Sequence, residues 1–202
     1  MRFANYIYWK NFLSEQECNR IIESNGHNLT DAKIGVGQGF NSKSRKTKVG
    51  LIEKDNSIQD LIEKIINQIC FAAQKYYGCS LKTFEQIQYA EYEKDMFFSW
   101  HVDSVTRLDE ITSYTRDISA SLILNKQTEY TGSSLQFILA GSVSPDNILT
   151  PEDAINQEQG TLIVFPSSTI HQVTKVTSGI RKSLVLWAAC GKFDIILSGH
   201  MS

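Results

Sequence analysis

The chain has 202 residues, of which 42% are hydrophobic and 21% charged, with a formal net charge of −2. This balance excludes the broad basic field on which nucleic-acid binding relies, and no stretch approaches the ~18 apolar residues needed to span a bilayer. The length allows one sizeable core. We therefore predict a single domain, residues 1–202, with neither nucleic acid nor membrane as a partner.

The N-terminal part is predicted to be mainly helical. Phe3–Trp9 favours an opening strand. Ser14 and Glu17 have the spacing of a capping box, which predicts a helix start. A second, longer helix is predicted over residues 57–77, where apolar residues recur at helical spacing, and Gly78 would end it.

Short β segments dominate the rest of the chain. The predicted strands are Thr83–Tyr92, Ile118–Leu124, Leu135–Leu139, Thr161–Phe165 and Ser183–Ala189. Strands separated by turns and joined by distant pairings are typical of a double-sheet jelly roll, the double-stranded β-helix. We expect a mainly β fold, with this core over residues 81–195 and a helical support over residues 1–80.

Three residues have the chemistry of an open metal site. His101 and Asp103 would point the same way from an extended segment, because side chains alternate along a strand. His171 follows 70 residues later, after a strand and a turn, so distant strands must lie side by side to complete the set. Two imidazoles and one carboxylate hold Fe(II) on one face and leave positions open for other ligands. His101, Asp103 and His171 are therefore our candidate iron ligands.

Arg181 is a candidate anion-binding residue. It opens an apolar strand in which Arg181, Ser183, Val185 and Trp187 would share one face. A buried Arg needs an anionic partner. Arg181, with Ser183 beside it, would suit the distal carboxylate of 2-oxoglutarate, which a guanidinium grips through two parallel hydrogen bonds.

The chain resembles the prolyl 4-hydroxylase-like branch of the Fe(II)/2-oxoglutarate-dependent dioxygenases, and in particular the PKHD-type hydroxylases. Phe12–Cys18, Tyr89–Ser104, Arg116–Gly132 and Gly160–Trp187 carry the resemblance. It implies that His101, Asp103 and His171 bind iron and are catalytic, and that Arg181 anchors 2-oxoglutarate. It also implies that a tyrosine contacts this co-substrate. Tyr89 and Tyr92 both lie at the corresponding place, and Tyr92 is favoured.

The same resemblance implies the reaction. O2 and 2-oxoglutarate would be consumed, a substrate hydroxylated, and succinate and CO2 released, with ascorbate as the reductant that family members commonly use. A prolyl residue of a peptide or protein is the leading substrate, and another amino-acid side chain or a small metabolite is the alternative. Two alternatives come from other functional classes. One is a cupin-like metal enzyme without redox chemistry, and the other is a non-catalytic binding protein that retains an inactive metal site.

Three smaller features complete the analysis. The four cysteines show no C-x-x-C spacing and lie mostly in apolar patterns, which predicts buried free thiols and a reducing cytoplasm. The basic run over residues 43–48 is predicted to be a solvated loop, with contact to substrate as the alternative. The polar stretch 104–115 directly follows two candidate ligands and is expected to form a rim over the substrate.

Overall fold

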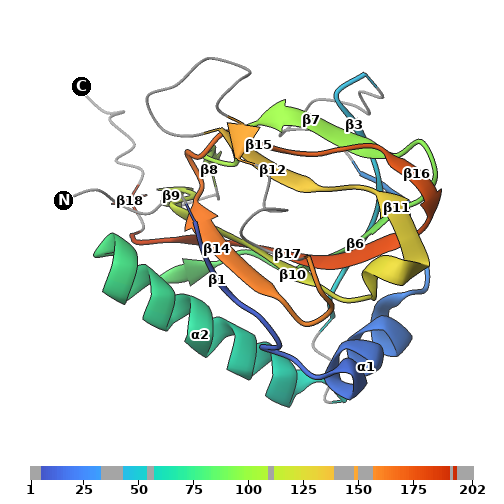
Figure 1. The fold of residues 1–202 in the computed structure, drawn as a ribbon. Helices are drawn as coiled ribbons and strands as arrows, with labels where there is room; N and C mark the ends of the chain where they lie inside the picture. The colour runs from blue at the N-terminus through green and yellow to red at the C-terminus, as the bar shows by residue number, and fades with distance from the viewer. Residues whose placement is uncertain are drawn as a thin grey trace, which may run out of the picture.

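The structure, a computed structural model, describes residues 6–32, 43–53, 57–108, 112–138, 148–149, 157–191 and 193–194. Two antiparallel sheets face each other, and two α-helices cover the outer side of the larger sheet (Figure 1). This arrangement confirms the mainly β, jelly-roll fold with flanking helices that the sequence predicts. Neither of the two helices in the described part of the chain is both long and apolar enough to cross a membrane.

The larger sheet has strands from both ends of the chain. Its order is β1 (Ile7–Trp9), β14 (Leu162–Pro166), β10 (Ile118–Ile123), β17 (Arg181–Ala189), β6 (Gln88–Tyr92), β4 (Lys48–Leu51) and β2 (Thr30–Asp31), with β5 (Thr83–Phe84) also paired to β17. The N-terminal 80 residues thus supply strands to the sheet as well as helices. Their division from the β core, and the extent of the single domain, stay predictions.

The smaller sheet lies across the interior from the larger one. Its order is β13 (Ile148–Leu149), β12 (Leu135–Ile138), β15 (His171–Val173), β7 (Phe97–His101) and β3 (Arg45–Lys46). At one end of the sandwich, β11 (Tyr130–Gly132) follows the short helix η1 (Gln127–Glu129) and pairs with β16 (Val176–Gly179). A separate three-stranded sheet contains β8 (Thr106–Leu108), β9 (Thr112–Thr115) and β18 (Phe193–Asp194).

The helices begin and end where the sequence signals predict. Helix α1 (Glu15–Asn25) has the expected capping box, in which Ser14 accepts from the Glu17 amide and Glu17 accepts from the Ser14 amide. Helix α2 (Gln59–Tyr77) ends at Gly78, whose φ of 67° is a left-handed conformation that glycine adopts without strain. Both helices pack one apolar face on the larger sheet and so hold that sheet against the smaller one.

Two apolar clusters fill the space between these layers. One lies between the helices and the outer face of the larger sheet and includes Ile65, Leu122 and Leu184. The other lies between the two sheets and includes Phe137 and Phe165. Strand β10 is buried along its whole length because both of its faces are covered. The second cluster surrounds the candidate site.

One prediction on the cysteines is wrong. Cys79 and Cys190 form a disulfide, with Cα atoms 5.6 Å apart. The two meet because Thr83 at the start of β5 pairs with Ala189 at the end of β17, a contact that no local spacing reveals. Cys18 and Cys70 are free thiols, as expected. Free thiols were the reason to expect a reducing cytoplasm. Cys79 and Cys190 no longer support that expectation.

The basic run over residues 43–48 differs from the predicted solvated loop. Arg45 and Lys46 form β3, which pairs with β7, and the Arg45 side chain is buried whereas Lys46 is exposed. Residues 104–115, expected to be a rim, contain the β8–β9 hairpin. Residues 109–111, which lie between the two strands in the sequence, are outside the described part.

Candidate metal and dicarboxylate site

The three candidate iron ligands lie together at one end of the smaller sheet. His101 ends β7, His171 begins β15, and the two are cross-strand partners. The Nε2 atom of His101 lies 3.6 Å from Oδ1 of Asp103, and the Nε2 atom of His171 lies 3.5 Å from Oδ2. All the ligand atoms lie within 4.8 Å of one another. Long-range pairing therefore brings together residues that are 70 positions apart.

Asp103 follows the strand rather than lying within it. The carbonyl of Ser167, in the turn after β14, accepts from the amides of both Asp103 and Ser104 at 2.9 Å. The Ser167 hydroxyl in turn pairs with Ser119 of β10 at 2.8 Å. A buried hydrogen-bond network, in place of a strand ladder, thus holds the carboxylate between the two imidazoles.

Backbone contacts fix the orientation of both imidazoles. Nδ1 of His101 lies 2.7 Å from the Ser99 carbonyl, and Nδ1 of His171 lies 2.9 Å from the Thr169 carbonyl. A carbonyl oxygen only accepts, so each Nδ1 carries a proton and donates it. The lone pair of each Nε2 is then directed at the cluster, which is the usual support for a metal-binding histidine.

Electrostatics keeps these groups in the forms that bind a metal ion. Burial works to raise the pKa of the Asp103 carboxyl, but hydrogen bonding to His101 and the proximity of His171 outweigh it and hold that pKa well below its usual range. Burial lowers the pKa of His171, as does His101, against the opposite effect of Asp103. An ionised carboxylate and a neutral imidazole are what metal binding requires at neutral pH.

A cavity lies beside this cluster, between the two sheets. Its walls are mainly apolar, and its polar groups include the three candidate iron ligands and two arginines. The lining residues are Arg45, Tyr92, Phe98, His101, Asp103, Ala120, Ser121, Leu135, Phe165, His171, Val173, Arg181, Ser183, Val185 and Trp187. Arg181, Ser183, Val185 and Trp187 all line it, so they share one face of β17 as strand alternation predicts.

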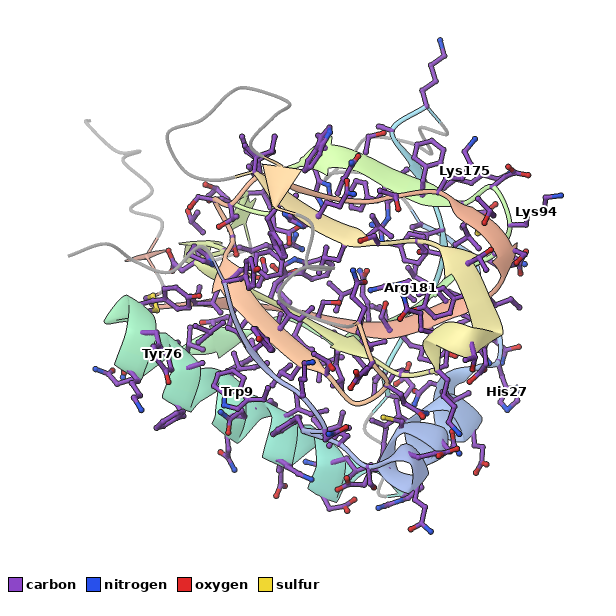
Figure 2. The ribbon with its side chains drawn as sticks, in the orientation of Figure 1. Trp9, His27, Tyr76, Lys94, Lys175 and Arg181 are labelled. Atoms are coloured by element: carbon purple, nitrogen blue, oxygen red, sulfur yellow. A yellow bond between two sulfur atoms is a disulfide. The ribbon has the colours of Figure 1, made fainter. Side chains whose placement is uncertain are left out.

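Arg181 is the anion-binding group of this cavity. It lies between the two sheets (Figure 2) and is only 1% exposed. Its Nη1 donates to the Ser183 hydroxyl at 3.0 Å, while Nε and Nη2 are buried with no hydrogen-bond partner among the described residues. Donors buried in this way are costly unless an acceptor meets them. A carboxylate with two oxygens fits the free edge of the guanidinium.

Tyr130 is a site residue that the sequence analysis missed. Its hydroxyl is buried, lies close to the Arg181 side chain and meets no acceptor within the described part of the chain. Burial raises the pKa of Tyr130, although the nearby charge of Arg181 opposes this, so the phenol stays protonated and can donate. No local spacing in the sequence marks it, because Tyr130 reaches the site through the pairing of β11 with β16, where it is opposite Gly179, two residues before Arg181.

The structure brings Tyr92 to the cavity and takes Tyr89 away from it. Both belong to β6, where Ala90 and Tyr92 face the smaller sheet while Tyr89 packs in the helix-side cluster. The Arg181 guanidinium lies 5.7 Å from the centre of the Tyr92 ring. The Tyr89 hydroxyl donates to Glu91 at 2.8 Å instead. The expectation that Tyr89 contacts the co-substrate is therefore withdrawn, because residues three apart on a strand face opposite sides.

A largely buried ion pair lies against Trp187, one of the residues of the cavity wall. Arg116 donates through Nε and Nη2 to the two carboxylate oxygens of Glu85, each at 2.5 Å. Its guanidinium carbon lies 3.9 Å from the centre of the Trp187 ring, which lines the cavity. This stack fixes the indole and so the shape of the wall next to Asp103.

The residues present fit a metal ion and a dicarboxylate together. Two imidazoles and one carboxylate are the facial donor set that suits non-haem Fe(II) and leaves positions open. Arg181, Ser183 and Tyr130 supply donors for a carboxylate in the same part of the interior. Such an arrangement can bind a metal ion and a second, chelating anion in one enclosed space.

The family model described as the 2OG-Fe(II) oxygenase superfamily matches residues 87–189, just over half of the chain. A PKHD-type hydroxylase of Shewanella oneidensis is 28% identical over 182 residues, which cover 88% of this chain and 75% of that protein.

Solved structures show the same fold. A prolyl-4-hydroxylase of Pseudomonas putida has a TM-score of 0.68 and 21% identity, covering 93% of each chain. A prolyl hydroxylase of Trichoplax adhaerens, in complex with a peptide fragment of the hypoxia inducible factor oxygen degradation domain, has a TM-score of 0.73 and 14% identity. It matches 92% of this chain and 84% of its own. Because the family model matches more than half of its residues, the chain belongs to the 2OG-Fe(II) oxygenase superfamily.

Proposed function

We propose that this protein is an Fe(II)- and 2-oxoglutarate-dependent hydroxylase in which His101, Asp103 and His171 hold the iron. The observation that carries the proposal is the meeting, in one cavity, of an open facial donor set and a buried arginine with free donors. A structural metal site would have a closed set of ligands and no reason for a buried cation beside it.

Arg181 is proposed to bind the distal carboxylate of 2-oxoglutarate. Its Nε and Nη2 would donate to the two carboxylate oxygens, while Ser183 holds Nη1 and so fixes the plane of the guanidinium. The Tyr130 hydroxyl would donate to the same carboxylate, and the Tyr92 ring packs against the guanidinium. This assignment adds Tyr130 to the predicted set and keeps Tyr92.

When bound, iron and 2-oxoglutarate would supply the oxidation by O2, with succinate and CO2 as products. The chain contributes placement and the exclusion of water. Asp103 stays ionised between two imidazoles, Nδ1 of each imidazole stays protonated on a carbonyl, and the apolar walls formed by Leu135 and Phe165 keep the interior dry.

A prolyl residue of a peptide or protein is the proposed substrate. Support comes from the prolyl hydroxylases of the same fold, one of which is in complex with a peptide fragment. Hydroxylation of another amino-acid side chain or of a small metabolite is the alternative within the same chemistry. Fold alone does not select between them.

An anaerobic titration with Fe(II), with and without 2-oxoglutarate, tests the proposal. We expect a weak visible charge-transfer band only when both are present, and its decay with formation of succinate when O2 is admitted, with ascorbate included as reductant. Bound metal with no such band would contradict the proposal and favour a Lewis-acid role of the metal.

Arg181→Gln is the matching variant for this titration. It should leave iron binding intact and raise the 2-oxoglutarate concentration required, because the distal carboxylate loses its cation. Lys182→Gln, which changes the next cation on the opposite face of β17, should leave both affinities unchanged.

A further inference from the structure

A second buried arginine lines the same cavity and has no assigned role. Arg45, on β3, is only 7% exposed, and its Nε has no hydrogen-bond partner among the described residues. Its guanidinium carbon lies 4.7 Å from the centre of the Phe98 ring. Phe98 in turn stacks on His101, with ring centres 3.5 Å apart and planes at 14°. One aromatic ring therefore separates Arg45 from a candidate iron ligand.

A count of formal charges shows that Arg45 is in excess. In the proposed complex, the two positive charges of Fe(II) and the one of Arg181 balance the single charge of Asp103 and the two of 2-oxoglutarate. Arg45 adds one positive charge, and no ion pair joins it to a carboxylate of the described residues. A buried charge without a partner is costly. The described residues thus supply no counter-ion for Arg45, and a molecule that enters the cavity can supply one.

We propose that Arg45 binds a carboxylate of the substrate, and that this protein acts on molecules with a carboxylate close to the carbon that is hydroxylated. The inference rests on the proposed function and names its substrate class. A single excess charge matches a monoanionic carboxylate, which the planar guanidinium binds through two hydrogen bonds. A doubly charged phosphate would leave a negative charge uncompensated in the same space.

The depth of Arg45 limits where this carboxylate can be. Because the side chain is buried within the cavity wall, an acidic residue far along a peptide would stay outside. The carboxylate must belong to the reacting unit or to its immediate neighbour, as in a free amino acid or the C-terminal residue of a peptide. Phe98, Leu135 and Val173 supply apolar walls for the rest of that unit.

Binding to the protein loaded with Mn(II) and 2-oxoglutarate, which avoids turnover, tests the inference by calorimetry. The probes are L-proline, N-acetyl-L-proline and its neutral amide, a short peptide with C-terminal proline as acid and as amide, and inorganic phosphate. We expect an acid to bind at least about tenfold more tightly than its amide. The free amino acid and the peptide acid distinguish the two sources of the carboxylate.

Two variants decide whether Arg45 is responsible. Arg45→Gln should abolish the preference for the acid, whereas Lys46→Gln, which removes the exposed neighbouring cation, should keep it. Equal binding of acid and amide by the wild-type protein, an acid preference that survives in Arg45→Gln, or tighter binding of phosphate than of any carboxylate would overturn the inference.

Stability of the ligand-free protein gives a readout that needs no substrate. Arg45→Met keeps the contact with Phe98 but removes the unpaired charge, so its thermal unfolding midpoint should rise by at least about 2 °C. A purely structural arginine would give a fall. Lys46→Met, the exposed control, should change little.

Co-substrate binding separates this inference from the proposed function. If Arg45→Gln weakened 2-oxoglutarate binding as much as Arg181→Gln does, Arg45 would belong to the co-substrate site, and the inference would fail while the proposed function stood. If the wild-type protein bound no 2-oxoglutarate, the proposed function would fail. The Arg45→Met stability comparison would still test whether the charge of Arg45 is unpaired in the ligand-free protein.

Discussion

Buried donors without acceptors mark the site at the scale of single residues. Most buried polar groups in folded proteins have a partner, yet Arg45, Tyr130 and Arg181 each bury a donor that has none among the described residues. Arg45 and Arg181 line the cavity, and Tyr130 lies beside Arg181. Such donors destabilise the free protein and strengthen binding of an anion that satisfies them.

Tyr130→Phe tests one of these donors. The variant keeps the ring and removes only the hydroxyl, so we expect 2-oxoglutarate to bind about 3–10-fold more weakly while iron affinity is unchanged. Titration of the metal-loaded protein measures both. Tyr89→Phe is the matched control on the opposite face of β6 and should leave 2-oxoglutarate binding unaltered. Equal effects of the two variants would contradict the role given to Tyr130.

Asp103→Ala tests the metal site. Loss of the only carboxylate of the described cluster should weaken Fe(II) binding by more than about 100-fold, beyond the effect of losing an outer partner of a ligand. Equilibrium dialysis with Fe(II) under anaerobic conditions measures this. Asp95→Asn, at an exposed carboxylate, should bind Fe(II) like the wild-type protein. An Asp103→Ala protein with unchanged affinity would contradict the ligand assignment.

At the scale of elements, the period of two along each strand explains what the sequence could predict. It placed Arg181, Ser183, Val185 and Trp187 on one face of β17 correctly, because an unbroken strand preserves the alternation. The alternation alone did not decide which of Tyr89 and Tyr92 faces the cavity, since the sequence does not say which face of β6 meets the helices.

Contacts between strands that are far apart in the sequence were not predicted, for a different reason. Tyr130 and Arg45 reach the interior because their strands pair with β16 and β7, and for residues 43–48 the sequence offered contact with substrate only as an alternative. The Cys79–Cys190 disulfide likewise depends on the pairing of β5 with β17. No periodicity or local spacing encodes such contacts, so they emerged only from the three-dimensional structure.

The capping box of α1 gives an element-scale prediction. Glu17 accepts from the Ser14 amide at 2.7 Å and pairs with Lys64 of α2 at 2.7 Å. Burial acts to raise the pKa of Glu17, but these bonds lower it overall. We expect Glu17→Ala to lower the free energy of unfolding at pH 7 by about 1 kcal/mol.

The effect should depend on pH. Because the folded-state pKa of Glu17 is lowered, its contribution is full above the unfolded value of about 4.3 and is lost as the pH falls further. Denaturant unfolding of wild type and Glu17→Ala should therefore converge in acid. Glu23→Ala, at an exposed position of the same helix, should show no such pH-dependent difference. A gap that stays constant into acid would contradict the ionic origin.

At the scale of the whole molecule, the disulfide ties the segment after α2 to the end of β17. Cys79 and Cys190 are 111 residues apart, so the bond restricts most of the unfolded chain. We expect reduction, or the double change Cys79→Ser and Cys190→Ser, to lower the free energy of unfolding by about 2–5 kcal/mol. Thermal unfolding with and without dithiothreitol measures this.

Cys70→Ser provides the control for that comparison. It removes a free, partly buried thiol and should keep the response to dithiothreitol. If the wild-type protein unfolded at the same temperature with and without the reductant, the stabilising role of the bond would be contradicted.

The position of β17 between two strands from earlier in the chain has a consequence for folding. Chains whose contacts join distant residues fold slowly, because each such contact must first close a long loop. β17 (Arg181–Ala189) pairs with β10 and β6 on its two sides, and these strands end at residues 123 and 92, far earlier in the chain. Until it docks, Arg181 and Ser183 are absent from the interior. Affinity for a dicarboxylate should thus arise only once β17 has docked, so that ligand binding reports the assembled sheet.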